Sequence, residues 1–368
     1  MKLLVLKENA SNENRIALSL EVIAKYKKVG VEVFVESKAG EKSMISDELL
    51  KESGANIVTD ISQIISEIDI IISVQRTDFE YSKVKKGAIF IALLNPYFQK
   101  DKIELLAKAD ISAFALELLP RTSRAQSMDV LSSQSNLAGY RAVIDAVYEM
   151  QKAVPMMMTA AGTISAAKFL ILGAGVAGLQ AIATAKRLGA IVSAFDVRAA
   201  AKEQVQSLGA KFVEVKSEEK AQGVYAQEMS EEYKKLQEQL LKDVIKNQDV
   251  VISTALIPGR KAPTLITEEM VKMMKPGSII IDTAAINGGN CELTEVEKEV
   301  EVNGVRIFGY ANFPSRVAAD TSKLLAKNIF NFLELLINKE KNSLSINLED
   351  DLVKATLVSD NGIVLFNK

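Results

Sequence analysis

The chain has 368 residues, of which 48% are hydrophobic and 25% are charged, and its formal net charge is −2. This length predicts about two domains, each with its own core, and the near-neutral charge argues against nucleic acid as a partner. The single cysteine, Cys291, cannot form an internal disulfide, so the chain gives no sign of an oxidising compartment.

Two segments bear on export and membrane insertion. The N-terminal stretch MKLLVLKENASNENR has neither a long apolar core nor a small-residue cleavage site, so no signal peptide is expected. The longest region of low charge, residues 153–185, is interrupted by Lys168 and carries a glycine-rich turn, so it is not expected to span a membrane. If the protein works at a membrane, another chain must hold it there.

The first third of the chain alternates short apolar runs with helical patterns. Continuous apolar strands separated by helices indicate a parallel sheet that is covered on both faces. Strands are expected at residues 3–6, 31–35, 70–74, 89–93 and 112–115, and helices at residues 16–29, 46–53 and 102–109.

A second set of alternating strands and helices begins at Phe169. Two longer helical patterns flank it, residues 131–153 before it and residues 316–337 after it. The tail contains short alternating runs and the turn signal Asp360-Asn361-Gly362. The later strands of this set are expected near residues 191–194, 212–215, 250–254, 278–282 and 305–309.

A glycine motif lies at the start of this second set. The apolar run 169–172 meets Gly173-x-Gly175-x-x-Gly178, a helix-forming stretch follows, and a second apolar run ends at Asp196. This order is the dinucleotide-binding fingerprint. Gly173 permits the tight turn, Gly175 leaves room for backbone to approach a pyrophosphate, and Gly178 lets the helix pack closely on the strand. The N–H groups that begin the helix are then available to the phosphate charge.

Asp196 indicates which dinucleotide is preferred. It lies 23 residues after Gly173, where a carboxylate accepts hydrogen bonds from both ribose hydroxyls. A 2′-phosphate would be repelled there, so NAD(H) is favoured over NADP(H).

These patterns together predict an α/β protein with two Rossmann-like domains, whose parallel sheets are joined by long helices. The first domain would comprise residues 1–138 and be completed by residues 316–368. The second domain, residues 139–315, would be an insertion that binds NAD(H).

The sequence contains no histidine. Most nicotinamide dehydrogenases that oxidise an alcohol or amine use a positioned acid or base, most often histidine. Lysine, tyrosine or a carboxylate could substitute. The absence nevertheless favours a reaction that needs no proton transfer at the reacting carbons, such as hydride exchange between two nicotinamides.

Residues 120–142, PRTSRAQSMDVLSSQSNLAGYRA, crowd polar side chains at the start of a predicted helix between the two domains. Dinucleotides often lie at domain junctions, so ligand contact is one interpretation. The other is a capped helix with surface ion pairs, in which Ser127 or Asp129 caps and Arg124 pairs locally. The two interpretations can coexist.

Several segments resemble a known family. PRTSRAQSMDVLSSQSNLAGYRAVIDA, FLILGAGVAGLQAIATAKRLGAIVSAFDVR, VVISTALIPGRKAPTLITEEMV, MKPGSIIIDTAAINGGNC and FPSRVAAD are similar to the NAD(H)-binding component, domain I, of proton-translocating NAD(P) transhydrogenase. RTSRAQSMD is specific to that family, whereas GAGVAG is widespread. The similarity extends over essentially the whole chain, and the length matches the separate polypeptide that carries this component in bacteria with a split alpha subunit.

The resemblance implies roles for individual residues. Arg121, Gln126 and Asp129 would lie against the nicotinamide end of NAD(H) as the catalytic residues, with Gln126 between two nicotinamide rings. Leu256 would contact the adenine side. Including the glycine motif, the expected cofactor-binding residues are Arg121, Gln126, Ser127, Met128, Asp129, Ser132, Gly173, Gly175, Val176, Ala177, Gly178, Asp196, Val197, Arg198, Gly223, Tyr225, Met229, Gln237 and Leu256. No metal site is expected.

Residues 223–237, GVYAQEMSEEYKKLQ, resemble the family's mobile loop, in which Tyr225 and Met229 would close over the nucleotide. Without the resemblance, charges at helical spacing suggest a solvated helix. Val224 stands where family members usually have a second glycine, which puts the hinge of this loop in doubt.

Alanine dehydrogenase, which shares the NENR pattern, is the alternative enzyme. Its catalytic lysine, histidine and aspartate correspond by eye to Gln75, Asn95 and Ile286 here. None of these three side chains can donate or accept the required proton. Arg15 of NENR, which would bind a substrate carboxylate in alanine dehydrogenase, is expected to be a structural remnant here.

The implied mechanism is direct hydride transfer from NADH on this chain to NADP⁺ on a partner subunit. The expected partners are an NADP(H)-binding beta subunit and membrane-spanning subunits, which would couple transfer to proton translocation. Homodimerisation is implied, as is a cytoplasmic location at the inner face of the membrane through these partners. A nucleotide-binding regulatory module without turnover is a third interpretation.

Overall fold

A computed structural model describes residues 1–215, 230–257 and 259–366. The chain divides into two compact units, unit 1 (Met1–Gln134 with Ser315–Lys368) and unit 2 (Ser135–Pro314). Unit 1 is therefore assembled from both ends of the chain, and unit 2 from one continuous stretch.

Unit 1 is built on an eight-stranded sheet with the order β19-β18-β6-β5-β4-β1-β2-β3. The first six strands in the sequence are parallel, and their order reverses next to β1. They are β1 (Lys2–Val5), β2 (Glu32–Glu36), β3 (Asn56–Val58), β4 (Ile70–Ile72), β5 (Ile89–Ala92) and β6 (Ser112–Ala115). The C-terminal segment adds the antiparallel strands β18 (Leu357–Asp360) and β19 (Ile363–Val364).

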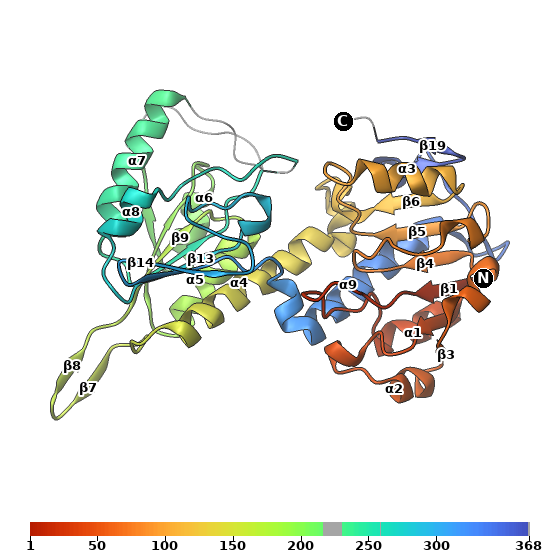
Figure 1. Ribbon diagram of the computed structural model, residues 1–368, viewed down its shortest axis with the longest axis horizontal. Helices are drawn as coiled ribbons and strands as arrows, with labels where there is room; N and C mark the ends of the chain where they lie inside the picture. Colours follow the sequence, from red (N-terminus) through yellow and green to blue (C-terminus); the bar gives the residue numbers. More distant parts are fainter. Residues whose placement is uncertain (216–229, 258, 367–368) are drawn as a thin grey trace. The chain divides into compact units, whose positions relative to one another are not determined.

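Helices cover both faces of this sheet (Figure 1). Within β1, Leu3 and Val5 belong to the core on one face and Leu4 to the core on the other. This explains the continuous apolar runs, because alternate residues of a strand point to opposite faces. The helices of unit 1 are α1 (Leu20–Lys28), α2 (Asp47–Glu52), α3 (Lys100–Lys108), α9 (Ala318–Leu333) and α10 (Asp351–Thr356).

Unit 2 repeats this architecture with a seven-stranded sheet, β11-β10-β9-β12-β13-β15-β14. All strands are parallel except the edge strand β14, and the order reverses next to β9. They are β9 (Lys168–Leu172), β10 (Ile191–Phe195), β11 (Lys211–Val213), β12 (Val250–Ser253), β13 (Ile279–Asp282), β14 (Glu299–Val302) and β15 (Val305–Phe308). The helices are α5 (Val176–Arg187), α6 (Ala201–Ser207), α7 (Glu231–Ile245) and α8 (Glu268–Met273).

The long helix α4 (Val130–Glu149) begins in unit 1 and continues into unit 2. Within unit 2 it approaches the start of α5 very closely, because a Cβ atom added to Gly139 would lie 2.0 Å from the carbonyl oxygen of Ala177. Gly139 is therefore required by packing.

The predicted α/β class with two Rossmann-like units is confirmed, and several local features differ from the prediction. The sheets are not wholly parallel at their edges. The first helix begins at Leu20 rather than residue 16, because Ser19 is extended at the N-cap and the Ile16 amide donates to the Ser322 hydroxyl. The helices expected at residues 131–153 and 316–337 end earlier, as α4 and α9. Asn361 and Gly362 form the expected turn, with φ of 47° and 76°.

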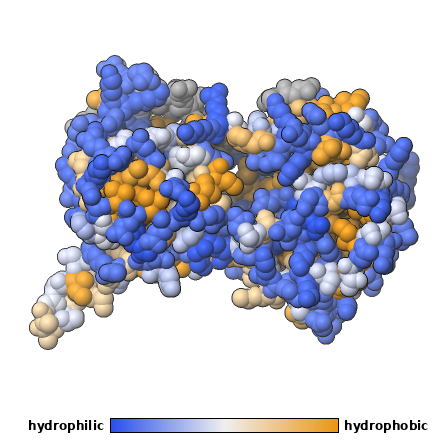
Figure 2. Space-filling view, viewed as in Figure 1, coloured by the Kyte–Doolittle hydropathy of each residue, from blue (hydrophilic) through white to orange (hydrophobic). Residues whose placement is uncertain are grey.

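Another difference is a hairpin that the sequence analysis did not predict. Strands β7 (Met157–Thr159) and β8 (Gly162–Ile164) form an arm on unit 2 whose residues are all exposed. Figure 2 shows the arm as a mostly white to pale orange projection. Within the described ranges, no helix combines the length and apolar character needed to cross a membrane.

Candidate functional site

The glycine turn joins β9 to α5 at the point where the strand order of unit 2 reverses, which is where open α/β sheets bind ligands. Gly173 has φ +96°, a conformation that favours glycine. A Cβ atom on Gly175 would meet nothing within 4 Å, whereas one on Gly178 would lie 1.8 Å from the Gly173 carbonyl oxygen. Gly175 thus faces open space and Gly178 is needed for packing.

Helix α5 begins directly after this open position. Gly175 is its N-cap, so the N–H groups of Val176, Ala177 and Gly178 have no acceptor within the helix. These three donors and the open space beside Gly175 fit the diphosphate of a dinucleotide.

Asp196, at the end of β10, already has a full set of donors. One carboxylate oxygen accepts the Ala174 amide at 2.7 Å and the Arg198 guanidinium at 2.9 Å. The other accepts the amide and Nε of Arg198 at 2.8 and 2.9 Å. Contact with a ribose therefore requires Arg198 to release at least one oxygen. Val197, between them, is partly buried against the core.

Leu256 lies on the loop after β12 and is 44% exposed. Asn290 fixes this loop through its side chain, which accepts the Ala255 amide at 3.0 Å and donates to the carbonyl oxygens of Ala255 and Pro263 at 2.9 and 2.8 Å. The buried carboxylate of Asp282 accepts the Asn290 amide at 2.7 Å. The sequence analysis missed both residues, although the INGGN run after a predicted strand was a signal.

The described part of the expected mobile loop is helical. Gln237 lies on α7, whose Tyr233, Leu241 and Ile245 are buried while most charged residues are exposed. This agrees with a solvated amphipathic helix. Gly223, Tyr225 and Met229 lie outside the described residues.

In unit 1, the polar segment forms the 3-10 helix η6 (Ser123–Met128), followed directly by α4. Ala125 and Met128 are buried in the core, so the Met128 side chain points away from solvent. Arg121, Gln126 and Ser127 are exposed.

The capping interpretation holds for this segment, with Asp129 rather than Ser127 as the cap. The Asp129 carboxylate accepts the amide and hydroxyl of Ser132 at 2.8 and 2.6 Å. Arg124 forms its ion pairs with Asp350 and Asp351, far along the chain rather than locally.

Arg15 is buried within a polar cluster beyond the end of β1. Its guanidinium donates to Glu13 at 2.6 and 2.8 Å and to Gln134 at 2.8 Å. Gln75 donates to the same Glu13 carboxylate at 2.8 Å. The position expected for a substrate-binding arginine is therefore engaged within the protein. Asn95 is exposed in a left-handed turn, and Ile286 is 65% exposed.

Two carboxyl groups near the strand ends of unit 1 have altered acidity. Burial, with the Glu13 carboxylate as the second cause, raises the pKa of Glu8 to about 7. Burial also raises the pKa of Glu117 to about 7. One Glu117 oxygen accepts the Asn95 amide, and the other is buried with no partner among the described residues.

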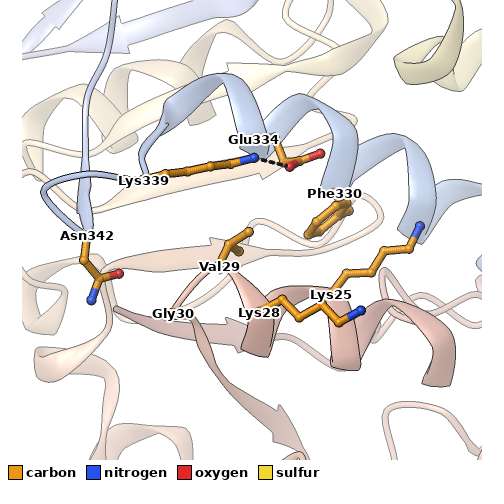
Figure 3. Close-up of a pocket in the computed structure, with 8 residues that line it drawn as sticks. All are labelled: Lys25, Lys28, Val29, Gly30, Phe330, Glu334, Lys339 and Asn342. Atoms are coloured by element: carbon orange, nitrogen blue, oxygen red, sulfur yellow. Dashed lines mark hydrogen bonds and ion pairs between the residues drawn. The ribbon is translucent and has the colours of Figure 1, made fainter.

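A hollow of about 510 Å³ on unit 1 lies apart from these segments (Figure 3). Lys25, Lys28 and Lys339 line it together with Phe330, and Lys339 pairs with Glu334 at 3.0 Å. Its described lining includes none of the expected site residues.

Two family models match the chain, "Alanine dehydrogenase/PNT, N-terminal domain" over residues 4–138 and "Alanine dehydrogenase/PNT, C-terminal domain" over residues 142–367. The first part of the NAD(P) transhydrogenase alpha subunit of Rhodospirillum rubrum is 52% identical to this chain. The alignment covers 99% of this chain and 98% of that protein. The chain therefore belongs to the alanine dehydrogenase/PNT family.

Solved structures agree with this assignment. A transhydrogenase from Sinorhizobium meliloti is 49% identical and superposes with a TM-score of 0.91, covering 99% of this chain and 100% of that one. An L-alanine dehydrogenase superposes with a TM-score of 0.80 over 99% of this chain and 97% of that one. Its sequence identity is 23%, so this likeness shows the shared fold. Membership of this family supports two statements about the chain: it binds NAD(H), and it is an oxidoreductase component of transhydrogenase.

Gly175 and Gly178 provide a matched pair of substitutions. Gly175→Ala should weaken NADH binding at least about tenfold, since the methyl group occupies the open phosphate approach, while stability changes by less than about 0.5 kcal/mol. Gly178→Ala should instead lower stability by about 1–3 kcal/mol through overpacking. Isothermal titration and denaturant melts measure both effects, and wild-type NADH affinity in Gly175→Ala would contradict this assignment.

Glu117 should make stability depend on pH. A carboxyl group whose pKa rises from 4.5 to about 7 on folding stabilises the fold at low pH and loses that contribution as pH rises between these values. Glu117→Gln lacks this loss. Its free energy of unfolding, relative to that of the wild type, should therefore be about 1–3 kcal/mol higher at pH 8 than at pH 5. Urea unfolding at both pH values tests this, with exposed Glu52→Gln as the control that should show no such gain.

Proposed function

We propose that this chain is the NAD(H)-binding subunit of a proton-translocating NAD(P) transhydrogenase. Whole-length similarity to transhydrogenase alpha subunits is the observation that carries the proposal. NADH supplies a hydride from its nicotinamide ring to NADP⁺ on a partner chain, giving NAD⁺ and NADPH with no proton exchanged at either carbon. The absence of histidine and of a base at Gln75, Asn95 and Ile286 is compatible with this reaction.

Unit 2 contains the groups that would hold the dinucleotide. The first amides of α5 would bind the diphosphate beside Gly175, and Asp196 would accept the ribose hydroxyls after Arg198 moves. Leu256 would contact the adenine side, and Gln237 with Gly223, Tyr225 and Met229 would belong to the closing loop.

The exposed edge of η6 would hold the nicotinamide. Arg121 and Gln126 would face the ring, since both are exposed while their neighbour Ala125 is anchored in the core. Asp129 would act through Ser132, whose hydroxyl it orients. Because positioning is the main contribution that such a reaction needs, no acid or base is required of these residues.

The proposal includes partner subunits. An NADP(H)-binding beta subunit and membrane-spanning subunits would hold the chain at the cytoplasmic face of the inner membrane and couple transfer to proton translocation. The chain would also form a homodimer. Met156, Met157 and Met158 at the hairpin arm are 63%, 45% and 78% exposed, which suits an apolar contact with a second copy.

Two other functions are less well supported. An alanine dehydrogenase would need a base where Gln75 donates to Glu13, and an arginine open to substrate where Arg15 is bonded to Glu13 and Gln134. A regulatory module without turnover would bind NADH yet exchange no hydride with an NADP(H)-binding partner.

Gln126→Asn tests the nicotinamide assignment. Shortening the side chain by one methylene should slow hydride transfer in the reconstituted complex on the order of 100-fold, because errors near 1 Å have that cost, while NADH affinity changes little. Asp129→Ala should slow hydride transfer as well, and it should also lower the free energy of unfolding by about 1 kcal/mol, since it removes the cap of α4. Stopped-flow transfer and melting curves separate the two, and an unchanged transfer rate in Gln126→Asn would remove η6 from the site.

Asp196 and Arg198 should control nucleotide choice in opposite directions. Asp196→Ala releases the guanidinium toward a 2′-phosphate and should narrow the preference for NADH over NADPH by about 1–3 kcal/mol. Arg198→Ala leaves the carboxylate available to ribose and should keep or widen that preference. Equilibrium dialysis with both nucleotides gives the values, and equal or tighter NADPH binding by the wild type would refute the assignment of Asp196.

A further inference from the structure

We propose that Asn328 of α9 is a positioning residue for hydride transfer, because its side-chain amide clamps η6 to the beginning of α4. Asn328 is absent from the set of residues that the sequence or the family resemblance assigns to the cofactor. The inference rests on the proposed role of η6 at the nicotinamide.

The clamp uses both ends of one buried amide. Asn328 is 7% exposed, and its Nδ2 donates to the Ser127 carbonyl oxygen at 2.9 Å. Its Oδ1 accepts the Ser133 hydroxyl at 2.7 Å. The first bond fixes the last turn of η6 and the second fixes the first turn of α4, so Asn328 holds the two elements on either side of Asp129.

A second amide strengthens the same anchor. Nδ2 of Asn331 also donates to the Ser127 carbonyl oxygen, at 2.9 Å. Residues three apart lie on one helix face, and a carbonyl oxygen can accept two bonds, so this face of α9 saturates the Ser127 carbonyl.

The anchored carbonyl is adjacent to Gln126 in the chain. Ala125 and Met128 hold the apolar side of η6 in the core, but side-chain burial at these positions does not fix the peptide between Ser127 and Met128, one residue beyond Gln126. The two hydrogen bonds from α9 to the Ser127 carbonyl oxygen fix that peptide. Without them this peptide could rotate and displace the Gln126 side chain by about 1 Å, an error that costs on the order of 100-fold in rate.

Other contacts keep α4 attached to α9 if the clamp is removed. Gln134 donates to the Thr321 carbonyl oxygen at 3.1 Å and accepts the Arg15 guanidinium at 2.8 Å. A substitution at Asn328 should therefore release η6 locally without unfolding unit 1.

Asn328→Asp is the deciding variant. It keeps the size of the side chain and the acceptor for Ser133, but it turns a carboxylate oxygen toward the Ser127 carbonyl. In the complex of the full chain with its NADP(H)-binding partner, at saturating NADH and NADP⁺, stopped-flow transfer should slow about 10- to 100-fold, while the NADH Kd changes less than about threefold.

Lowering the pH gives a readout that a merely structural role would not move. A buried aspartate is protonated more readily, and its carboxyl proton can again be donated to the Ser127 carbonyl. The ratio of the Asn328→Asp rate to the wild-type rate should therefore rise as pH falls. Exposed Lys327→Ala on the same helix is the control and should transfer at the wild-type rate.

The outcomes separate the two proposals. A wild-type complex without hydride transfer would refute the proposed function, whereas an active wild type matched by Asn328→Asp would refute the clamp alone. If Asn328→Asp does not fold, Asn331→Asp decides, because it removes one anchor from a partly exposed position. Slowing of about threefold or more supports the clamp, and a wild-type rate overturns it.

Discussion

Burial of both faces of each parallel sheet is the constraint on which the rest of the structure depends. Strands such as β4 and β13 are buried along their whole length, so charged side chains near them lie beyond the ends of the strands or at their last residue. Glu8, Gln75 and Glu117 follow strands of unit 1, and Asp196 follows β10 in unit 2. The fold thus gathers its polar groups at the carboxyl edge of each sheet, which is the edge at which α/β sheets bind ligands.

Local chemistry made much of this predictable. Continuous apolar runs identified most of the parallel strands, and the glycine motif identified the turn after β9, because each signal depends on a few neighbouring residues. The pairing of β18 with β6 was not predictable in this way, since it joins segments about 240 residues apart. The β7–β8 arm was missed because its exposed methionines resemble a core pattern.

The site residues show the same division. Asp129 was a candidate cap from its position alone, whereas Arg124 was expected to pair nearby and instead contacts Asp350. The bonds of Asn328 to Ser127 and Ser133 join positions that no local pattern connects. Long-range polar contacts of this kind depend on the finished fold, and a single sequence contains no periodic signal for them.

The polar cluster beyond β1 is compatible with the proposed hydride transfer, which needs no acid or base at the reacting carbons. Glu13, Arg15 and Gln75 satisfy one another, and Gln134 joins them to α4. Groups that would otherwise require a substrate are satisfied by the protein itself, which favours a static framework. Such a framework suits a reaction whose rate depends on distance rather than on proton transfer.

The division of unit 1 between the two ends of the chain has a consequence for synthesis on the ribosome. Residues 1–134 are translated before unit 2, but the core of their sheet also needs α9, α10 and β18, which are translated after it. At typical elongation rates the intervening unit 2 takes on the order of ten seconds or more to be made, and it can fold as one continuous segment during that time. Apolar strands of unit 1 remain uncovered meanwhile, so the nascent chain should depend on chaperones until α9, α10 and β18 have emerged.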